Sequence, residues 1–413
     1  MGGKFQSLPG FRDLYPEDCA VRNYVFEHWR AVAHRYNFHE YEGPLLEPSE
    51  LYKKKSGDEI LQQLFHFEDR GQRSVAMRPE LTPTLARMAV ARQRDYRKPI
   101  RWFSIGQFFR YEKPQKGRGR EFYQLNVDIL GEDSEAADAE LIAFAIDLML
   151  DLGFATGDFI IRLSNRDAWI DFMQNESIPP ENLQDFLQVI DKMERDKPES
   201  TEKKLNALGS SRQAVENFIT SNAAEKHFTS IMTDLNARNL ANHVTIDLGV
   251  VRGLAYYTGT VFEVFDSSKS MRAVAGGGRY DELCGLIGGN STSMPACGFA
   301  MGDVVITDLI KETKKANARL LNYLGNTSAT DIQVIIADEA NRQQALSSIQ
   351  QLRNAGFRVN YSMTANKVGK QFTQAEHAKA RVAVIIGSEF PEIIIKDLAQ
   401  RREHKAEAGE ILE

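Results

Sequence analysis

Residues 102–130 have the pattern of two antiparallel strands joined by a short loop. Side chains alternate between the two faces of a strand, so Arg110 and Glu112 should share one face of the first strand. The letters KPQKGRG that follow contain a proline and two glycines, which favour a loop. The letters EFYQLNVDIL then predict the return strand, with Gln124 and Asp128 on one face. We therefore predict a hairpin that carries two polar pairs and a basic tip.

Positive charge is concentrated on this hairpin, although the chain as a whole is acidic. Residues 97–120 contain eight Lys or Arg and a single acid, Glu112, whereas the whole chain has a formal net charge of −6. A charge run is often only a solvated surface. Here the aromatic residues Trp102, Phe103 and Phe108 are interleaved with the cations, and the loop is rich in glycine. This combination favours a platform that holds a polyanion such as phosphate.

Length and composition indicate an ordinary globular protein of two or three domains. The chain has 413 residues, of which 42% are hydrophobic and 26% charged. No apolar run approaches the roughly 18 residues that a membrane span needs, and the N-terminus lacks a hydrophobic signal core. The cysteines Cys19, Cys284 and Cys297 have no CxxC spacing, so neither a disulfide framework nor a protein-bound metal is predicted. We expect a soluble cytoplasmic protein that makes no membrane contact.

The order of patterns predicts an α+β architecture in two parts. In the first part, residues 1–325, a helix should start near Thr82 as N-cap, and strands should alternate with helices. A polar region at about 169–241 has no strand alternation and predicts a helical insertion. Residues 331–413 read as βαβαβ, a small α/β domain with a largely parallel sheet. That domain has 11 Lys or Arg and 11 Asp or Glu, so any contact with nucleic acid must depend on the placement of charge.

Several segments, taken together, resemble one enzyme family. EYEGPLLEPSELYKKKSG is similar to motif 1 of class II aminoacyl-tRNA synthetases, the dimerising segment, and FFRYEKPQKGRGREFYQLNVDILG is similar to motif 2. SMPACGFAMG resembles the start of motif 3, and the C-terminal domain resembles the anticodon-binding domain of the class. VVRGLAYYTGTVFEV resembles a signature of the histidine-specific members. On these segments the chain resembles the histidyl-tRNA synthetases over almost its full length.

This resemblance implies both a fold and an activity. The fold would be a class II catalytic core, an antiparallel sheet flanked by helices, in residues 1–325, followed by an anticodon-binding domain in residues 331–413. The activity would be that of a homodimeric histidine–tRNA ligase, which activates L-histidine with ATP and transfers it to the 3′ end of tRNA(His). Mg²⁺ would accompany the pyrophosphate group. The alternative is a non-catalytic paralogue that binds histidine or tRNA as a regulatory subunit.

The resemblance also implies roles for individual residues. Arg110 and Arg252 would approach the α-phosphate of ATP from opposite sides and would be catalytic together with Gln124. In the activation step an anionic carboxylate attacks an anionic α-phosphate, so cations are needed to reduce the repulsion. Arginine is suitable because its guanidinium stays charged and can bind two oxygens at once. The residues expected to bind histidine are Glu80, Leu81, Thr82, Arg110, Gln124, Asp128, Arg252, Tyr256 and Tyr257. The residues expected to bind ATP are Arg110, Glu112, Arg118 and Arg120.

Without the resemblance, each of these residues also has a purely structural interpretation. Arg110 and Glu112 could form an ordinary ion pair, and Glu80 could be an acid favoured by a helix N-terminus. Asp128 could be a buried structural carboxylate, and the adjacent tyrosines could be part of an aromatic core. Strict strand alternation would also place Arg252 on the opposite face from the second tyrosine, so their joint use would require a bulge.

The resemblance is incomplete at two positions. Ala255 stands where the family usually has aspartate in its RGLDYY signature, and Val305 stands where motif 3 has an arginine that binds the triphosphate. The loss of one preorganised donor costs roughly 3 kcal/mol, or about a hundredfold in rate. Such a loss weakens an enzyme but need not abolish its activity. Arg118, Arg120 or Arg279 could supply the missing charge.

Overall fold

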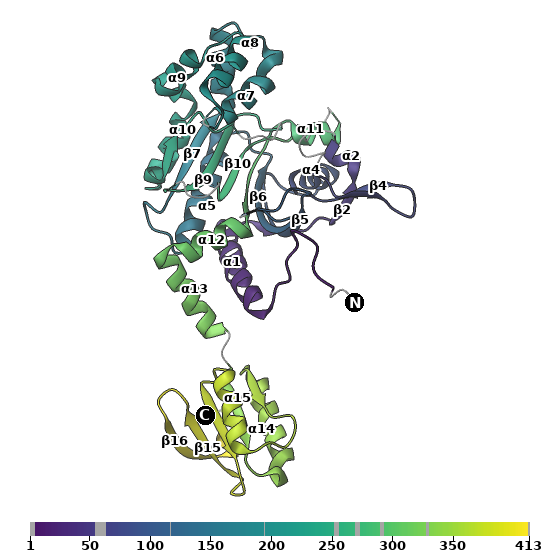
Figure 1. Ribbon diagram of the computed structural model, residues 1–413, viewed down its shortest axis with the longest axis vertical. Helices are drawn as coiled ribbons and strands as arrows, with labels where there is room; N and C mark the ends of the chain where they lie inside the picture. Colours follow the sequence, from purple (N-terminus) through teal and green to yellow (C-terminus); the bar gives the residue numbers. More distant parts are fainter. Residues whose placement is uncertain are drawn as a thin grey trace. The chain divides into compact units, whose positions relative to one another are not determined.

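The chain divides into two compact units, Met1–Leu320 and Leu321–Glu413. Figure 1 shows the chain as a computed structural model. The structure describes residues 5–53, 63–115, 117–193, 195–251, 256–268, 273–289, 293–327 and 330–411.

The first unit is built on an eight-stranded sheet with the order β1-β5-β6-β11-β10-β9-β7-β8. The strands in this order are β1 (His39–Glu40), β5 (Ile100–Phe109), β6 (Glu121–Leu130), β11 (Ala296–Gly302), β10 (Ala275–Arg279), β9 (Thr260–Asp266), β7 (Phe159–Asn165) and β8 (Val244–Ile246). The five inner pairs are antiparallel, and the edge strands β1 and β8 pair in parallel. The predicted antiparallel core is confirmed, with a parallel strand added at each edge.

The hairpin predicted from the sequence is formed by β5 and β6. The two strands pair over ten residues each, from Ile100↔Leu130 to Phe109↔Glu121, and a bridge between Gln115 and Arg118 narrows the loop. The prediction of the first strand was too long, because β5 ends at Phe109. Strand alternation therefore does not place Arg110 and Glu112 on a common face, since both lie in the loop.

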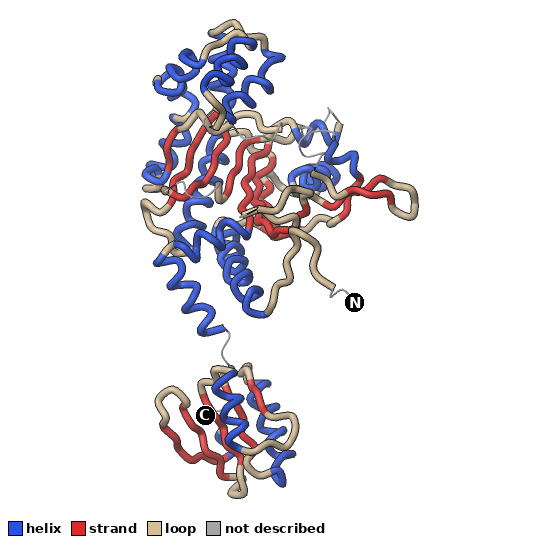
Figure 2. Tube along the Cα trace, in the orientation of Figure 1, coloured by secondary structure: helices blue, strands red, loops and turns tan. Residues whose placement is uncertain are grey.

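Helices cover both faces of this sheet (Figures 1 and 2). One face is covered by α1 (Pro16–Arg35), α5 (Glu135–Asp151) and α12 (Asp303–Glu312). The other face carries α4 (Thr82–Ala91) and α11 (Leu283–Gly288), which share a buried cluster with Ile100 and Leu130 of the hairpin. The N-cap of α4 is Leu81, so the expectation of Thr82 in that position was wrong by one residue.

A second, smaller sheet lies beside α4 in the first unit. Its strand order is β2-β4-β3, with β2 (Leu46–Pro48), β4 (Ser74–Met77) and β3 (His66–Glu68), and α2 (Ser49–Lys53) follows β2. Both strand pairs of this sheet are antiparallel. The chain leaves β4 at Met77 and enters α4 at Thr82, so Glu80 lies in the short turn that connects them.

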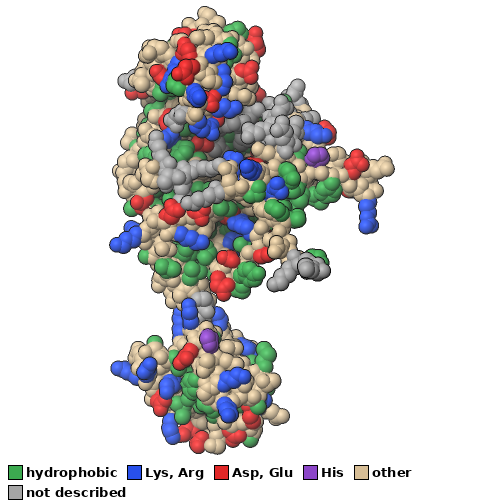
Figure 3. All heavy atoms as spheres, in the orientation of Figure 1, with side chains coloured by type: hydrophobic (Ala, Val, Ile, Leu, Met, Phe, Trp, Pro, Cys, Tyr) green, Lys and Arg blue, Asp and Glu red, His purple; other side chains and the backbone are tan. Residues whose placement is uncertain are grey.

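The polar region between β7 and β8 is helical, as its sequence predicts. Its helices are α6 (Arg166–Asn175), α7 (Leu183–Lys192), α8 (Pro198–Ala207), α9 (Arg212–Thr220) and α10 (Thr229–Ala237). Trp169 is fully buried, and its ring packs against those of Phe172, Phe186 and Phe218. The insertion therefore has an aromatic core of its own. On the face drawn in Figure 3, acidic and basic side chains are intermixed over α6–α9.

The second unit contains a five-stranded mixed sheet with the order β13-β12-β14-β15-β16. Its elements are β12 (Ile332–Ile336), α14 (Arg342–Asn354), β13 (Val359–Tyr361), α15 (Val368–His377), β14 (Val382–Ile386), β15 (Glu392–Asp397) and β16 (Arg402–Glu407), and α13 (Lys314–Thr327) spans the boundary between the units. The first three strands are parallel, as βαβαβ predicts. The last two are antiparallel and were not predicted.

Candidate active site

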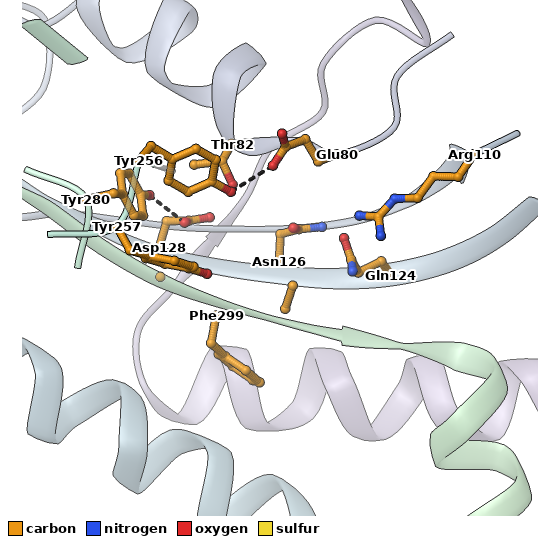
Figure 4. A pocket seen from close by; sticks show the side chains of 12 residues that line it. Glu80, Thr82, Arg110, Gln124, Asn126, Asp128, Tyr256, Tyr257, Tyr280 and Phe299 are labelled. Atoms are coloured by element: carbon orange, nitrogen blue, oxygen red, sulfur yellow. Dashed lines mark hydrogen bonds between the residues drawn. The ribbon is translucent and has the colours of Figure 1, made fainter. Parts of the chain in front are cut away.

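A pocket opens on the sheet face that carries α4 (Figure 4). It contains about 450 Å³ of space outside the protein atoms. The side chains that project from β6 form its floor, and the turn before α4 and the segment before β9 form its walls. The residues that line it are Glu80, Thr82, Arg110, Gln124, Asn126, Asp128, Tyr256, Tyr257, Tyr280, Gly298, Phe299 and Ala300.

Arg110 supplies the positive charge at one end of the pocket. Its Nε donates a hydrogen bond of 2.9 Å to the carbonyl oxygen of Pro79, and its guanidinium carbon lies 5.3 Å from the centre of the Phe122 ring. These contacts fix the side chain and leave both terminal nitrogens directed toward the pocket, as Figure 4 shows. Arginine in this arrangement can bind an anion through two parallel hydrogen bonds.

Asp128 is the acidic group at the opposite end of the pocket. It is only 4% exposed, and Oδ1 accepts a hydrogen bond of 2.6 Å from the Tyr280 hydroxyl. Burial raises the pKa of Asp128 to about 7, because the charged form is poorly solvated, although the Tyr280 bond opposes the shift. A buried carboxylate that titrates near neutral pH can accept a hydrogen bond, so it suits a ligand with ring N–H donors.

Glycine is required beside Asp128. Gly298 on β11 is the register partner of Asp128, and a methyl group at Gly298 would come within 1.9 Å of Asp128 Oδ1. Any larger residue at Gly298 would displace the carboxylate. Because Gly298 has no side chain, the Asp128 carboxylate on β6 can lie above the neighbouring strand β11.

Glu80 and Tyr256 form a hydrogen-bonded pair at the top of the pocket in Figure 4. The Tyr256 hydroxyl donates to Glu80 Oε2 over 2.7 Å, and both residues are buried. Burial and the adjacent Glu80 carboxylate raise the pKa of Tyr256, so the hydroxyl stays protonated and can donate. Thr82, in the first turn of α4, lines the same wall. The wall thus offers a carboxylate and a hydroxyl, which are acceptors for an ammonium group.

Two cations of the hairpin loop, Arg118 and Arg120, lie outside the residues that line this pocket. Arg118 forms an ion pair with Glu112 at 2.8 Å, with its side chain 48% exposed. Arg120 Nε donates to the Glu112 carbonyl oxygen over 3.1 Å, and its guanidinium carbon lies 4.1 Å from the centre of the Tyr111 ring. The described residues that line the pocket include none of Glu112, Arg118 and Arg120. These three residues are thus brought together with one another, next to the pocket wall that Arg110 forms.

Other predicted residues fall elsewhere or cannot be placed. The described residues that line the pocket do not include Leu81, whose side chain is buried in the core. Arg252 and Ala255 lie outside the described residues. Tyr256 and Tyr257 do not belong to a strand, because β9 begins only at Thr260. Strict strand alternation therefore does not apply to these two tyrosines.

Arg279 cannot replace the missing motif 3 arginine, so that suggestion was wrong. It is 6% exposed and forms ion pairs with Asp138 at 2.6 Å and Asp281 at 3.1 Å. It also donates to the carbonyl oxygens of Glu132 and Ser134. Although burial disfavours its charged form, contact with Asp138 raises the pKa of Arg279. All of its donors are used within the protein core.

Val305 lies next to the hairpin loop. One of its methyl groups is 3.6 Å from the point that a Cβ would occupy at Gly117, the residue before Arg118. The helix α12 that carries Val305 begins at Asp303, whose carboxylate accepts hydrogen bonds from Arg12 at 2.8 Å and from the Tyr123 backbone at 2.9 Å. The motif 3 position is thus occupied by an apolar side chain under the basic loop.

Sequence reasoning missed Asn126, Tyr280 and the β11 residues of the pocket. Strand alternation could have predicted Asn126, because it lies two residues from both Gln124 and Asp128 and must share their strand face. The contact between Tyr280 and Asp128 joins residues 152 positions apart, and it exists only because β10 and β11 follow β6 in the sheet. No local pattern in the sequence predicts such a contact.

Two family models match this chain. One, described as histidyl-tRNA synthetase, matches residues 10–306, and the other, described as an anticodon binding domain, matches residues 331–413. The first covers more than half of the chain, including every residue that lines the pocket.

Named relatives match the chain over nearly its whole length. The histidine–tRNA ligase of Opitutus terrae is 39% identical over 97% of this chain and 94% of its own length. The chloroplastic and mitochondrial histidine–tRNA ligase of Arabidopsis thaliana is 34% identical over 92% of this chain and 79% of its own length. The crystal structure of histidyl-tRNA synthetase from Nostoc sp. PCC 7120 is 25% identical, covers 100% of this chain and 99% of its own, and superposes with a TM-score of 0.78.

The sheet, its flanking helices and the attached α/β domain define a class II aminoacyl-tRNA synthetase with an anticodon-binding domain. Within that class, the model match and the full-length relatives agree on one amino acid. The chain belongs to the histidyl-tRNA synthetase family.

Proposed function

We infer that this protein is an ATP-dependent histidine–tRNA ligase. It activates L-histidine to histidyl-adenylate and transfers the histidyl group to the 3′ end of tRNA(His). The observation that carries this conclusion is the full-length match to ligases of that name, which spans both the pocket and the anticodon-binding domain.

We propose that the amino acid lies along β6, with its ring at Asp128 and its α-amino group at the opposite wall. Asp128 accepts a hydrogen bond from one imidazole nitrogen, and Tyr257 contacts the other. Glu80, Thr82 and Gln124 hold the ammonium group. The polarity of the pocket supports this orientation, because its acceptors lie where the ligand has donors. A site with buried hydrogen-bonding groups rejects amino acids that leave those groups unpaired.

Arg110 and Arg252 are proposed to act on the α-phosphate. One oxygen of the histidine carboxylate attacks the α-phosphorus, the bond to the β-phosphate oxygen breaks, and pyrophosphate leaves. Charge on the phosphate oxygens grows in the transition state, and fixed cations stabilise it. The hydrogen bond from Arg110 to the Pro79 carbonyl supports this role, since it preorganises the guanidinium before the nucleotide binds. Gln124 orients the carboxylate beside Arg110.

The outer phosphates are proposed to contact the hairpin loop. Arg118 is half-exposed and adjoins the residue that packs on Val305, so it lies where motif 3 would otherwise supply an arginine. Arg120 and Glu112 belong to the same cluster. Because the Arg118–Glu112 pair is solvent-exposed on the arginine side, its rearrangement around a triphosphate costs little.

Mg²⁺ would accompany ATP rather than occupy a site made by the protein alone. Among the residues that the structure describes, no group of three or more His, Cys, Asp or Glu side chains could hold a metal ion. Mg²⁺ commonly keeps several waters and binds through substrate phosphates and one or two carboxylates. The ion would neutralise charge on the leaving pyrophosphate.

We also propose that the protein is a homodimer that acts in the cytoplasm on tRNA(His). The segment similar to motif 1 and the exposed apolar side chains of Leu45, Leu46 and Phe67 near the small sheet support a dimer interface. None of the helices in the described part of the chain is long and apolar enough to cross a membrane.

Histidine-dependent exchange between ATP and pyrophosphate tests the activity. The purified protein should catalyse the exchange with histidine and show only background exchange with the other amino acids. It should also charge tRNA(His) with histidine. Binding of tRNA without any exchange would instead support a non-catalytic regulatory paralogue, a role that the full-length ligase relatives do not favour.

A further inference from the structure

Asn126 is a buried polar residue in the pocket whose amide nitrogen lacks a partner. It is 5% exposed, and its Nδ2 makes no hydrogen bond to any of the described residues. Its side chain lines the pocket floor, and Figure 4 shows its amide directed along the floor toward Gln124 and Arg110. An unsatisfied buried donor is expensive, and native proteins keep such groups where a ligand or an ordered water completes them.

The position of Asn126 on β6 restricts which part of a ligand it can meet. Gln124, Asn126 and Asp128 share one strand face, so Asn126 lies about 7 Å from each neighbour along the strand. The register neighbour of Asn126 on β11 is Ala300, whose small side chain leaves the space above the amide open. A ligand with its ring at Asp128 must therefore pass over Asn126 on its way to Arg110.

The chemistry of Nδ2 then selects the group that it binds. The amide nitrogen only donates hydrogen bonds, so its partner must be an acceptor. The ammonium group of an amino acid has no acceptor, and the ring nitrogens are at the Asp128 end. The carboxylate is the acceptor that remains between the ring and the α-phosphate site.

We propose that Asn126 Nδ2 donates a hydrogen bond to the α-carboxylate of bound histidine. The bonded oxygen is the one that does not attack phosphorus, so the other oxygen is turned toward the α-phosphate beside Arg110. Asn126 is thereby a further substrate-binding and positioning residue. The inference rests on the proposed histidine activation and adds a donor that neither the arginines nor Gln124 supply.

The test compares two ligands with wild-type protein and the Asn126→Ala variant. Histamine has the ring and the amino group of histidine but no carboxylate. A hydrogen bond to a charged group is worth about ten- to a hundredfold in affinity. Asn126→Ala should therefore weaken histidine binding by about that factor in calorimetric titration and leave histamine binding within about twofold. Asn126→Asp, which has the same shape but places a negative charge beside the carboxylate, should weaken histidine binding at least as much.

The matched control is Asn165→Ala. Asn165 is equally buried at 5% exposed, but its side-chain oxygen accepts a hydrogen bond from the Asp167 backbone and caps α6. This variant should lower the melting temperature while leaving histidine affinity unchanged. Asn126→Ala should weaken histidine binding and leave the melting temperature unchanged, because its Nδ2 makes no hydrogen bond within the described part of the chain.

Each other outcome overturns the proposal. Equal weakening of histidine and histamine would mean that Asn126 shapes the pocket or meets the ring. Unchanged affinity for both would mean that Nδ2 holds only a water, for example together with the buried Oγ of Ser104, its register neighbour on β5. If the wild-type protein itself fails to exchange pyrophosphate with histidine, the proposed function fails, whereas normal wild-type exchange with an unaffected Asn126→Ala variant refutes only the role of Asn126.

Discussion

Replacing Asp128 with asparagine should stabilise the ligand-free protein at alkaline pH while weakening its hold on histidine. Burial raises the pKa of Asp128 from 3.8 to about 7. Between these two values the folded state binds more protons than the unfolded state, so the free energy of unfolding falls as pH rises. Each pH unit is worth about 1.4 kcal/mol, which makes the charged carboxylate cost the folded state about 4 kcal/mol above pH 7.

The Asp128→Asn variant removes this cost because an amide cannot ionise. At pH 8 the gain approaches the full value of about 4 kcal/mol, whereas at pH 5 it falls to about 1.6 kcal/mol, since pH 5 lies only slightly above 3.8. The assay is the melting temperature of variant and wild type at both pH values, without ligand. Histidine titrations at pH 8 should show at least tenfold weaker binding by the variant, because a hydrogen bond to a charged acceptor is lost.

The matched control is a second buried aspartate, Asp138, which is 2% exposed. Asp138 pairs with a buried cation, Arg279, at 2.6 Å, whereas Asp128 forms no ion pair with any residue that the structure describes. Asp138→Asn should destabilise the protein at pH 8 by about 3–5 kcal/mol, because a buried guanidinium is left uncompensated. If Asp128→Asn also lowers the melting temperature at pH 8, or raises it equally at pH 5 and pH 8, then ionisation of Asp128 does not destabilise the folded state.

Three further predictions concern single side chains. Arg252→Ala should reduce histidine-dependent pyrophosphate exchange by about a hundredfold or more without changing the melting temperature, and a loss of only a few-fold would exclude Arg252 from catalysis. Gly298→Ala should weaken histidine binding and leave ATP binding intact, because its methyl group would displace the carboxylate of Asp128; unchanged affinity would show that the carboxylate has another position. Arg118→Ala should raise the KM for ATP about tenfold with little effect on the KM for histidine, and an unchanged KM for ATP would remove the loop from the nucleotide site.

The sequence predicted the parts of the site that depend on local geometry. Alternation along one strand was enough to place Gln124 and Asp128 together on β6, because strand periodicity is a property of neighbouring residues. The end of β5 at Phe109 could not be read in the same way, since Arg110 and Tyr111 fit a strand equally well. In the second unit β16 was missed because its polar sequence, REHKAE, does not resemble a strand with a buried face.

Contacts between distant segments were beyond the reach of sequence reasoning. Tyr280 reaches Asp128 because β11 pairs with both β6 and β10, and the chain turns away from β10 at that tyrosine. Arg279 looked like a free cation in the sequence, but the fold surrounds it with Asp138, Asp281 and two carbonyl groups. Arg279 and Tyr280 are adjacent in the sequence, but Tyr280 lines the pocket and Arg279 pairs with Asp138. The order of the strands in the sheet decides which of the two contributes to the site.

The valine at the motif 3 position changes how the nucleotide must be held. Asp303 anchors the start of α12 through Arg12 and the backbone of Tyr123, so this helix is tied to the N-terminal segment and to β6. Val305 then packs under the hairpin loop. The small side chain of Val305 lets the loop lie against the helix. The loop brings its own cations, and we infer that binding of the outer phosphates depends on the order of the loop more than on the helix.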